Sequence, residues 1–279
     1  MDGDADIAAV SALLAEPARA RMLMALADGR ALPASVLASE AGVAASTASE
    51  HLAKLLDGDL VAAERHGRHR YFRLAGPHVG ELLEAVAKVA APAPVRSLRQ
   101  GTRANAVRCA RLCYDHLAGR LGTALMAALI ERGLLTGGDG RFDPARARAD
   151  RLSGPGRDLD YRLTAAGEAE LGRLGIDLAA LPPRRPAVRY CVDWSEQRHH
   201  LAGAVGAALA TRLLELRWIR RADAGRAVHL TDAGRDGLAR AFGIDVAAVE
   251  QARGAATAGS SSRARSAPAP AAPAAAAGP

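Results

Sequence analysis

The sequence predicts a mainly α-helical protein with small β-hairpins, in which an N-terminal winged helix-turn-helix domain precedes a C-terminal α+β domain. Two observations lead to this fold class. A helix–turn–helix pattern followed at once by a basic hairpin occupies residues 33–74, and a series of sequence words that begins at Cys113 recurs in the same order from Cys191. This duplication predicts that the C-terminal domain is built from two helix–hairpin–helix repeats.

The composition is that of a globular protein. With 279 residues, 49% hydrophobic and 24% charged, the chain can build two domains with sizeable cores. Aromatic residues make up 3%, which argues against modules that bind nucleic acid by base stacking. The formal charge of +7 is carried almost entirely by arginine, since Lys54 and Lys88 are the only lysines in the sequence. Arginine suits phosphates and guanine edges, but the codon usage of a GC-rich genome would enrich it equally.

Three features bear on where the protein works. No run of about 18 apolar residues is present, so we expect no membrane partner. The start, Met1 to Asp6, is acidic where a signal peptide would be basic. Three cysteines do not fit a disulfide framework. We therefore expect a cytoplasmic protein.

The domain boundaries follow from shifts in composition. The run Ala-Pro-Ala-Pro that begins at Ala91 interrupts the helical pattern, because proline removes a helix donor. The end of the chain is rich in Ala, Pro, Ser and Gly and lacks the apolar bulk that would offset ordering. The predicted division is a DNA-binding domain at 1–90, a linker at 91–105, an effector or dimerisation domain at 106–250 with repeats at 106–186 and 187–250, and a disordered tail at 251–279.

The stretch from residue 33 to residue 61 predicts the helix-turn-helix. A first helix runs from about Ser35 to Ala41, and Gly42 permits the turn that follows. A second helix begins near Ser46 or Thr47, where Thr47-Ala-Ser-Glu50 fits a capping box. Leucines at 52, 55 and 56 hold this second helix on the core.

The opposite face of the second helix presents short polar groups suited to a major groove. The hairpin at 60–74 turns at Gly67 and carries arginines suited to a DNA backbone or minor groove. Its position directly after the helix-turn-helix disfavours the alternative of a merely solvated turn on an unrelated domain. The candidate DNA-binding residues are Ser46, Thr47, Ser49, Glu50, His51, Lys54, Arg65, Arg68, His69 and Arg70.

The duplication sets the plan of the C-terminal domain. One copy contains Cys113-Tyr-Asp-His116-Leu-Ala-Gly119, and the other contains Cys191-Val-Asp193 and then His200-Leu-Ala-Gly203. Later in each copy a Leu-Thr pair, at Thr164 and Thr231, predicts the end of a strand and the cap of a helix. The glycines of the His-Leu-Ala-Gly-x-x-Gly words predict a close approach of two helices. We expect the copies to pack as a pseudo-twofold pair.

Residues 6–90 resemble the ArsR/SmtB-type winged helix-turn-helix repressors. The words that carry the resemblance are Pro17-Ala-Arg-Ala-Arg21-Met-Leu, Leu37-Ala38, Ala41-Gly42-Val43, Ser46, Ser49-Glu-His-Leu52, Leu60-Val61 and the Gly67 wing. Asp59 stands where the family usually has Gly, which Asp tolerates through left-handed geometry. The resemblance implies a homodimer, paired through the helices at about 6–14 and 77–90, that represses by binding a two-fold-symmetric operator in double-stranded DNA at the nucleoid.

The same resemblance indicates where metal-sensing relatives hold their ions. They place thiolates on the first helix of the motif, or Asp/His pairs on the last helix. Residues 35–41 contain no cysteine, and residues 77–90 offer only His78, Glu81 and Glu84, so these sites are missing. The duplicated region is itself similar to the C-terminal part of longer ArsR-type regulators with Cys-Tyr-Asp-His-Leu-Ala-Gly and Asp-Trp-Ser-Glu words. That resemblance implies no particular ligand.

We therefore expect any effector site in the duplicated region. Cys109, Cys113 and His116 have the i, i+4, i+7 spacing of one helix face, and Cys113 and Cys191 would converge if the copies pack symmetrically. The candidate metal or effector residues are Cys109, Cys113, Asp115, His116, Cys191, Asp193, Trp194, His199 and His200. Three thiolates would favour Cd²⁺ or Pb²⁺, whereas thiolate with imidazole would suit Zn²⁺ or Ni²⁺. We expect no required cofactor.

Other interpretations of these residues stay open. The cysteines and histidines could be ordinary core residues, or thiols that respond to oxidation. Tyr114, Tyr190 and Trp194, with the polar residues up to Arg198, would suit a small organic ligand, or would simply join the two copies. A thiol enzyme would need an orienting group and an oxyanion loop, which the sequence does not show, so we predict no enzyme. An architectural DNA-binding protein without sequence preference is the remaining alternative.

Overall fold

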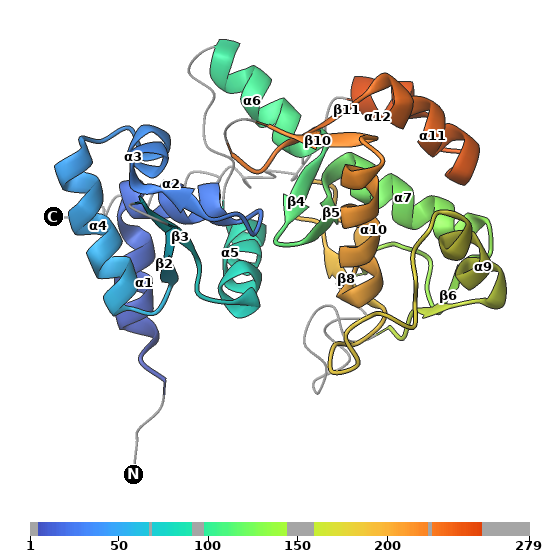
Figure 1. The fold of residues 1–279 in the computed structure, drawn as a ribbon, viewed down its shortest axis with the longest axis horizontal. Coiled ribbons are helices and arrows are strands. Elements are labelled where there is room, and N and C mark those ends of the chain that lie inside the picture. The colour runs from blue at the N-terminus through green and yellow to red at the C-terminus, as the bar shows by residue number, and fades with distance from the viewer. Residues whose placement is uncertain (1–4, 67–68, 91–97, 144–158, 223–224, 253–279) are drawn as a thin grey trace, which may run out of the picture.

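The structure is a computed structural model that describes residues 5–66, 69–90, 98–143, 159–222 and 225–252. It shows two domains side by side, with the N-terminal one in blue and the C-terminal one in green to red (Figure 1). Within these ranges no helix has both the length and the hydropathy needed to cross a membrane. Gly67, Arg68, residues 144–158 and residues 253–279, on which the predicted turn at Gly67 and most of the predicted disordered tail fall, lie outside the described residues.

The N-terminal domain has the predicted winged helix-turn-helix fold. Its elements are α1 (Ile7–Ala15), α2 (Pro17–Leu26), β1 (Leu32–Pro33), α3 (Ala34–Ala41), α4 (Ala45–Asp57), β2 (Val61–His66), β3 (His69–Leu74) and α5 (Pro77–Val89). The strands form an antiparallel sheet in the order β1-β3-β2, and the hairpin β2–β3 is the wing. Buried residues of α2, α3 and α4, among them Leu23, Leu37 and Leu52, form the core beneath the sheet.

Two backbone positions of this domain behave as predicted, and one predicted cap is wrong. Gly42 ends α3 in the left-handed region at φ 70°, and Asp59 adopts φ 52° before the wing. The second helix, however, begins at Ala45 with Ala44 as its N-cap and no side-chain cap. Because the Gly42 turn is so short, Thr47 already lies inside the helix, and the capping box at Thr47-Ala-Ser-Glu50 does not form.

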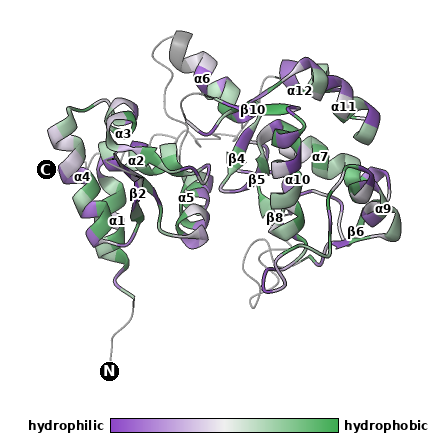
Figure 2. Ribbon diagram, viewed as in Figure 1, coloured by the Kyte–Doolittle hydropathy of each residue, from purple (hydrophilic) through white to green (hydrophobic). Residues whose placement is uncertain are grey.

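The C-terminal domain consists of two repeats preceded by α6 (Leu98–Cys109). The first repeat contains β4 (Arg111–Cys113), β5 (His116–Ala118), α7 (Gly119–Glu131), β6 (Leu135–Thr136), β7 (Arg162–Leu163) and α9 (Ala165–Arg173). The second repeat contains β8 (Arg189–Val192), β9 (His199–Ala202), α10 (Gly203–Glu215), β10 (Ile219–Arg221), β11 (Val228–Leu230), α11 (Asp232–Phe242) and α12 (Val246–Gln251). The strands pair as two-stranded antiparallel hairpins. Apolar residues of both repeats share one core, and polar stretches such as much of α11 lie outside it (Figure 2).

Each repeat therefore opens with a hairpin that the sequence did not suggest. The helix face expected for Cys109, Cys113 and His116 is wrong, because α6 ends at Cys109 and the other two residues lie on β4 and β5. Tyr114 takes the left-handed conformation at φ 60° in the turn between them, which an α-helix cannot accommodate. Residues 98–105 of the expected linker belong to α6.

The glycines of the repeated motifs admit backbone at close range. Gly119 allows the expected approach of two helices, because a Cβ there would lie 2.7 Å from the carbonyl oxygen of Arg108 in α6. A Cβ on Gly122 would lie 2.5 Å from the carbonyl oxygen of Leu117, and one on Gly206 would lie 2.7 Å from that of Leu201. Gly122 and Gly206 thus admit the backbone of the hairpin in their own repeat. Beyond this hairpin, a Cβ on Gly122 would lie 3.5 Å from His200 Cβ, and one on Gly206 would lie 3.4 Å from His116 Cβ. This reciprocal packing is the pseudo-twofold arrangement that the duplication predicted.

The second helix of each repeat is capped as predicted. Thr164 Oγ1 accepts a hydrogen bond of 3.1 Å from the backbone N–H of Gly167, and Thr231 Oγ1 accepts one of 3.0 Å from Gly234. These hydrogen bonds satisfy an N–H group that the first turn of a helix otherwise leaves without a partner.

Candidate DNA-binding face and metal centre

The helix α4 presents a polar face to solvent. Ser46, Ser49, Glu50 and Lys54 are exposed, and Thr47 and His51 are half-buried. On the other side Ala48, Leu52 and Leu55 are fully buried against the domain core. The helix therefore has the amphipathic form that a recognition helix needs, with its polar residues free to reach base edges.

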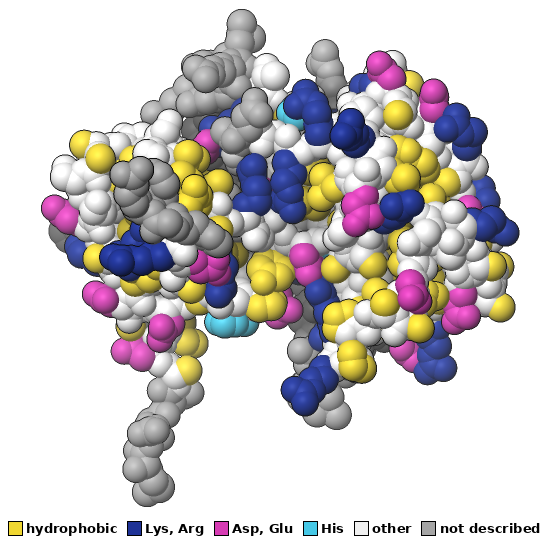
Figure 3. Space-filling view, in the orientation of Figure 1, with side chains coloured by type: hydrophobic (Ala, Val, Ile, Leu, Met, Phe, Trp, Pro, Cys, Tyr) yellow, Lys and Arg dark blue, Asp and Glu magenta, His cyan; other side chains and the backbone are white. Residues whose placement is uncertain are grey.

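The wing carries a pair of arginines that face each other. Arg65 on β2 stands directly opposite Arg70 on β3, and both are exposed. Like charges in this position repel unless an anion lies between or beside them. The side chain of His69 and the whole of Arg68 lie outside the described part. Figure 3 shows Lys and Arg side chains on both domains in the same view, with several near the junction.

Four potential metal ligands meet between the repeats. Cys113 and His116 are cross-strand partners on β4–β5, and Cys191 and His200 are cross-strand partners on β8–β9. The sulfur atoms and one ring nitrogen of each histidine all lie within 4.8 Å of one another. The two imidazole rings stack with centroids 5.2 Å apart. Each repeat thus contributes one thiol and one imidazole to a common cluster, in equivalent positions.

Each histidine of the cluster has a carboxylate close to its Nδ1 atom. Asp115 Oδ1 lies 3.1 Å from His116 Nδ1, and Asp193 Oδ2 lies 3.5 Å from His200 Nδ1. Both ring nitrogens of His200 are buried without a hydrogen-bond partner among the described residues, whereas His116 has the Cys113 thiol beside it as well as Asp115. Burial would raise the pKa of Asp115, but His116 and Arg185 hold it at about 2. A carboxylate behind the ring is the usual support of a metal-binding histidine.

The cysteine pair is polarised. A hydrogen bond between the two sulfur atoms, together with burial, raises the pKa of Cys113 to about 12. The same hydrogen bond lowers the pKa of Cys191, because it stabilises the thiolate there. The Cys191 thiol therefore loses its proton more readily than the Cys113 thiol.

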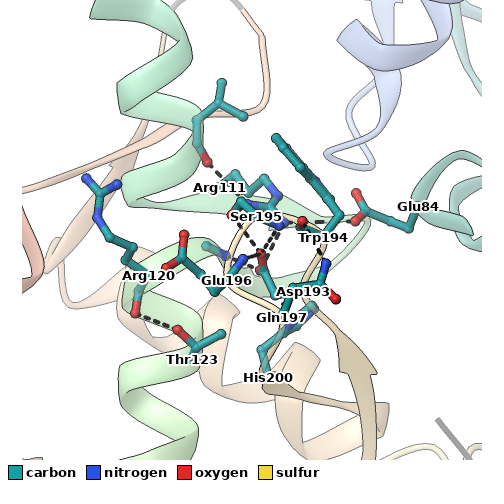
Figure 4. Close-up of polar contacts among 12 residues, drawn as sticks. Glu84, Arg111, Arg120, Thr123, Asp193, Trp194, Ser195, Glu196, Gln197 and His200 are labelled. Carbon is teal, nitrogen blue, oxygen red and sulfur yellow. Dashed lines mark hydrogen bonds and ion pairs between the residues drawn. The ribbon is translucent and has the colours of Figure 1, made fainter. Parts of the chain in front are cut away.

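Asp193 is anchored by a buried arginine that the sequence analysis missed. Arg111 Nη2 lies 2.9 Å from Asp193 Oδ2, and both side chains are fully buried. The backbone N–H of Gly119 and the hydroxyl of Ser195 also donate to Asp193, and the ring of Trp194 covers the Arg111 guanidinium at 4.7 Å (Figure 4). Burial would raise the pKa of Asp193, but Arg111 and His200 lower it. A signal was present: an arginine precedes the cysteine by two residues in both copies, as Arg111 and Arg189.

Other predicted effector residues lie apart from the four ligands. Cys109 ends α6 and does not join the cluster, so the three-thiolate set is not assembled. His199 contacts the Tyr161 hydroxyl at 2.9 Å and packs on Tyr190.

The three aromatic residues of the organic-ligand interpretation diverge. Tyr114 packs against the N-terminal core, Tyr190 packs with Tyr161, and Trp194 covers Arg111. An open pocket of about 230 Å³ at the domain junction is lined by Tyr114, with Asp28, Leu112 and Arg221 among its other residues. Tyr190 and Trp194 do not line it.

Comparisons with known proteins agree with this architecture. A family model described as a helix-turn-helix domain matches residues 14–63. The chain is 38% identical over 231 residues to the uncharacterized HTH-type transcriptional regulator YdfF of Bacillus subtilis, covering 82% of this chain and 94% of that one. The chain belongs to the HTH-type transcriptional regulators. Since 231 residues exceed the N-terminal domain, the relation to YdfF extends into the repeats.

Further similarities to these regulators concern the N-terminal domain. CmtR of Mycobacterium bovis is 38% identical over 87 residues, which is 30% of this chain and 73% of CmtR. The solution structure of the homodimeric winged helix-turn-helix domain of Mb0332, also from M. bovis and a possible ArsR-family regulator, is 34% identical and covers 31% of this chain and 86% of that one, with a TM-score of 0.27. The resemblance to ArsR-type winged helix-turn-helix regulators is confirmed, and the protein is a DNA-binding transcription regulator.

Proposed function

We propose that this regulator is a homodimeric repressor whose hold on a specific operator is released by a metal ion in the C-terminal domain. The observation that carries the effector assignment is the convergence of Cys113, His116, Cys191 and His200 within 4.8 Å. Two of these residues come from each repeat, and the buried His200 ring, whose nitrogens have no hydrogen-bond partner among the described residues, supports a ligand at this place. We assign no catalytic role to any residue, and we expect the protein to act on DNA in the cytoplasm, at the nucleoid.

Contacts to DNA are assigned to α4 and the wing. The exposed polar face of α4 would read base edges, and Arg65 and Arg70 would contact phosphates or the minor groove. Arg68 and His69 belong to the same proposed contact by their place in the sequence. A dimer would present two recognition helices to half-sites about one helical turn apart.

Exposed apolar residues support pairing through α1 and α5. Among the described residues, the large hydrophobic side chains that remain exposed are Ile7, Val86 and Val89, at 73%, 42% and 86%. They lie on α1 and α5, the helices through which the ArsR-type resemblance implies dimerisation. Burying such side chains against a second copy would remove apolar surface from water.

Repression is tested by fluorescence anisotropy on the DNA upstream of the protein's own gene. The reduced protein is titrated onto this DNA and onto a scrambled duplex at fixed salt, and Cd²⁺ or Zn²⁺ is then added. We expect specific binding that the metal weakens in the wild type and in Cys109→Ser, but not in Cys113→Ser. Equal affinity for both duplexes would refute specific regulation through that promoter, and equal release of both cysteine variants would refute the effector site.

The recognition helix has its own test. Ser49 is exposed and donates only to the Ala45 carbonyl oxygen of the preceding turn. Ser49→Ala should relax base preference by about 1–3 kcal/mol at one position, and Ser39→Ala on α3 should leave preference unchanged. An unchanged base preference in Ser49→Ala would show that another face of α4 reads DNA.

Thiol oxidation is a second candidate signal, favoured by the hydrogen bond between Cys113 and Cys191. Two neighbouring thiols, one of which loses its proton more readily than the other, are the arrangement from which a peroxide can produce a disulfide. Treatment with peroxide, followed by mass spectrometry and the anisotropy measurement, tests this candidate. Release of DNA together with a Cys113–Cys191 disulfide would support it, and unchanged DNA affinity in the disulfide form would exclude it.

A further inference from the structure

We infer that the cluster of Cys113, His116, Cys191 and His200 is a four-coordinate centre for a zinc-class divalent ion, and that this ion fixes the Tyr114 turn that docks on the DNA-binding domain. The inference deepens the proposed function, on which its regulatory half rests. It names the class of ion and the route by which the ion acts.

The donor set identifies the class of ion. Two sulfur and two imidazole nitrogen donors form the set that tetrahedral Zn²⁺, or Co²⁺ in its place, takes in proteins. The softer Cd²⁺ and Pb²⁺ would bind more favourably to a set with a third thiolate. The cluster lacks that third sulfur donor, because Cys109 is not part of it. Asp115 is hydrogen-bonded to His116 Nδ1, and Asp193 Oδ2 lies 3.5 Å from His200 Nδ1, so Nε2 of each ring is left to face the ion.

The size of the cluster implies a movement on binding. Bond lengths of about 2.3 Å to sulfur and about 2.0–2.1 Å to nitrogen place the ligand atoms of a tetrahedral ion roughly 3.3–3.8 Å apart. The ligand atoms here lie within 4.8 Å of one another. An ion would therefore draw the β4–β5 and β8–β9 hairpins together by up to about 1 Å.

The turn that would move is the one that contacts the DNA-binding domain. Tyr114 lies between Cys113 and Asp115, and its backbone N–H donates a hydrogen bond of 2.8 Å to the carbonyl oxygen of Ala27. Its carbonyl oxygen would meet a Cβ on Gly29 at 2.9 Å, and its ring lies over Gly80 of α5. Coordination of Cys113 and His116 would thus set the position of a turn wedged between the end of α2 and α5.

A second chain of contacts leads from the cluster to α5. His200 lies beside Asp193, Asp193 pairs with Arg111, and Arg111 Nη2 lies 4.0 Å from Glu84 Oε2 (Figure 4). Glu84 is on α5 and also pairs with the buried Arg226. The helix α5 is one of the two proposed dimer helices, so a shift there would change the spacing of the recognition helices.

The metal centre is tested by titrating the apo full-length protein with Co²⁺. We expect one ion per chain, with the intense visible bands of tetrahedral cobalt and a thiolate charge-transfer band, all displaced by Zn²⁺. Cys113→Ser and His200→Gln should lose this spectrum, and Cys109→Ser should keep it. A weak octahedral spectrum, or an unchanged spectrum in Cys113→Ser, would overturn the assignment whatever the DNA measurements show.

The coupling is tested by amide hydrogen exchange with and without Zn²⁺, a readout that needs no DNA. In the wild type we expect Zn²⁺ to change exchange in peptides covering the end of α2 and α5. Tyr114→Ala should keep the tetrahedral Co²⁺ spectrum and lose this change. On operator DNA the same ion should shift wild-type affinity by about 5-fold or more, and that of Tyr114→Ala by less than about 2-fold.

The outcomes separate this inference from the proposed function. Tetrahedral Co²⁺ with no effect of Zn²⁺ on exchange or on DNA affinity would make the centre structural, overturning the regulatory half and the proposed effector together. Release of DNA by Cd²⁺ without a tetrahedral Co²⁺ centre would overturn the inference and leave the proposed function standing. Absence of specific DNA binding would overturn the proposed function and the regulatory half that rests on it, whereas the spectra and the exchange would still decide the metal centre and its contact with the Tyr114 turn.

Discussion

The backbone N–H of Tyr114 is hydrogen-bonded to the carbonyl oxygen of Ala27 at 2.8 Å, so the turn that joins two candidate ligands is also a joint between the domains. On the other side of this joint, Arg30 donates to the carbonyl oxygens of Ala222 and Gly225, and Arg221 donates to that of Asp28. The segment after α2 is thus held at several points by the C-terminal domain. Substitutions at this joint should affect both stability and regulation.

Gly29→Ala should destabilise the protein through the joint. Gly29 has φ +77°, and a Cβ there would lie 2.9 Å from the Tyr114 carbonyl oxygen. Gly133→Ala is the matched control, because Gly133 has φ +66° and nothing within 4 Å of its Cβ position. The left-handed backbone costs each variant about 1–2 kcal/mol. In thermal or urea unfolding, we expect the free energy of unfolding to fall by at least about 1 kcal/mol more in Gly29→Ala than in Gly133→Ala. Equal losses in the two variants would show that the contact between Gly29 and Tyr114 can adjust to the added methyl group.

Gly122→Ala should disturb the hairpin that carries His116. The added Cβ would lie 2.5 Å from the carbonyl oxygen of Leu117, which follows that ligand. A backbone carbonyl cannot move aside as a flexible side chain can. We therefore expect Gly122→Ala to lower the free energy of unfolding by about 2–4 kcal/mol and to weaken Co²⁺ binding. Gly172→Ala on α9, where a Cβ would meet nothing within 4 Å, should be neutral or stabilise by up to about 1 kcal/mol. Equal stability of the two variants would contradict the close approach.

Glu84 should make stability depend on pH. Burial would raise its pKa, but Arg226 and Arg111 lower it below the usual value. A lowered folded-state pKa means that the carboxylate stabilises the fold above the ordinary Glu pKa of about 4.3, and that this contribution is lost as pH falls through the lowered value. At neutral pH, Glu84→Gln should lower the free energy of unfolding by about 3–5 kcal/mol, because it leaves the buried Arg226 without its carboxylate partner.

The control for Glu84 lies on the same helix. Glu81 is exposed, so Glu81→Gln should change stability by no more than about 0.5 kcal/mol. Urea unfolding from pH 7 down to pH 3 is the measurement, and the difference between wild type and Glu84→Gln should shrink toward the acid end. A difference that stays constant with pH would show that the carboxylate contributes by packing and not by charge.

Arg65→Ala should weaken DNA binding without harm to the fold. Arg65 is exposed opposite Arg70, so its removal relieves a repulsion and should alter stability by less than about 0.5 kcal/mol. Affinity for operator and scrambled DNA should fall alike, and the slope of log affinity against log salt should decrease by about 1. Arg162→Ala, on an exposed arginine of β7, should change neither quantity. An unchanged salt slope in Arg65→Ala would exclude a phosphate contact there.

Much of the fold could be predicted because its signals are local. The left-handed Gly42, the buried leucines of α4 and the threonine caps at 164 and 231 each act within a few residues. The duplication predicted the convergence of Cys113 and Cys191, since two similar units tend to pack symmetrically. The wrong predictions came from patterns that fit two structures. The spacing of three residues between Cys113 and His116 suits both a turn of helix and a hairpin with a two-residue loop. The left-handed backbone of Tyr114 is compatible only with the hairpin.

The supporting charges could not be predicted from local patterns. Arg111 meets Glu84 and Asp193 across long separations in the chain, so no periodicity connects them. The packing of the Tyr114 side chain on Gly80 depends on how the two domains contact each other. The sequence of one domain alone does not specify that contact. Such contacts are set by tertiary packing, and only the repetition of Arg111 as Arg189 hinted at a shared role.

The equal contribution of the two repeats has a consequence for the cell. All four candidate ligands belong to one polypeptide, so their effective concentration is set by the fold and not by the abundance of the protein. Dilution that separates the two copies of the proposed dimer would leave the proposed metal centre of each chain whole. The ion concentration that fills the proposed centre would therefore be the same in a cell with few copies of this regulator as in a cell with many.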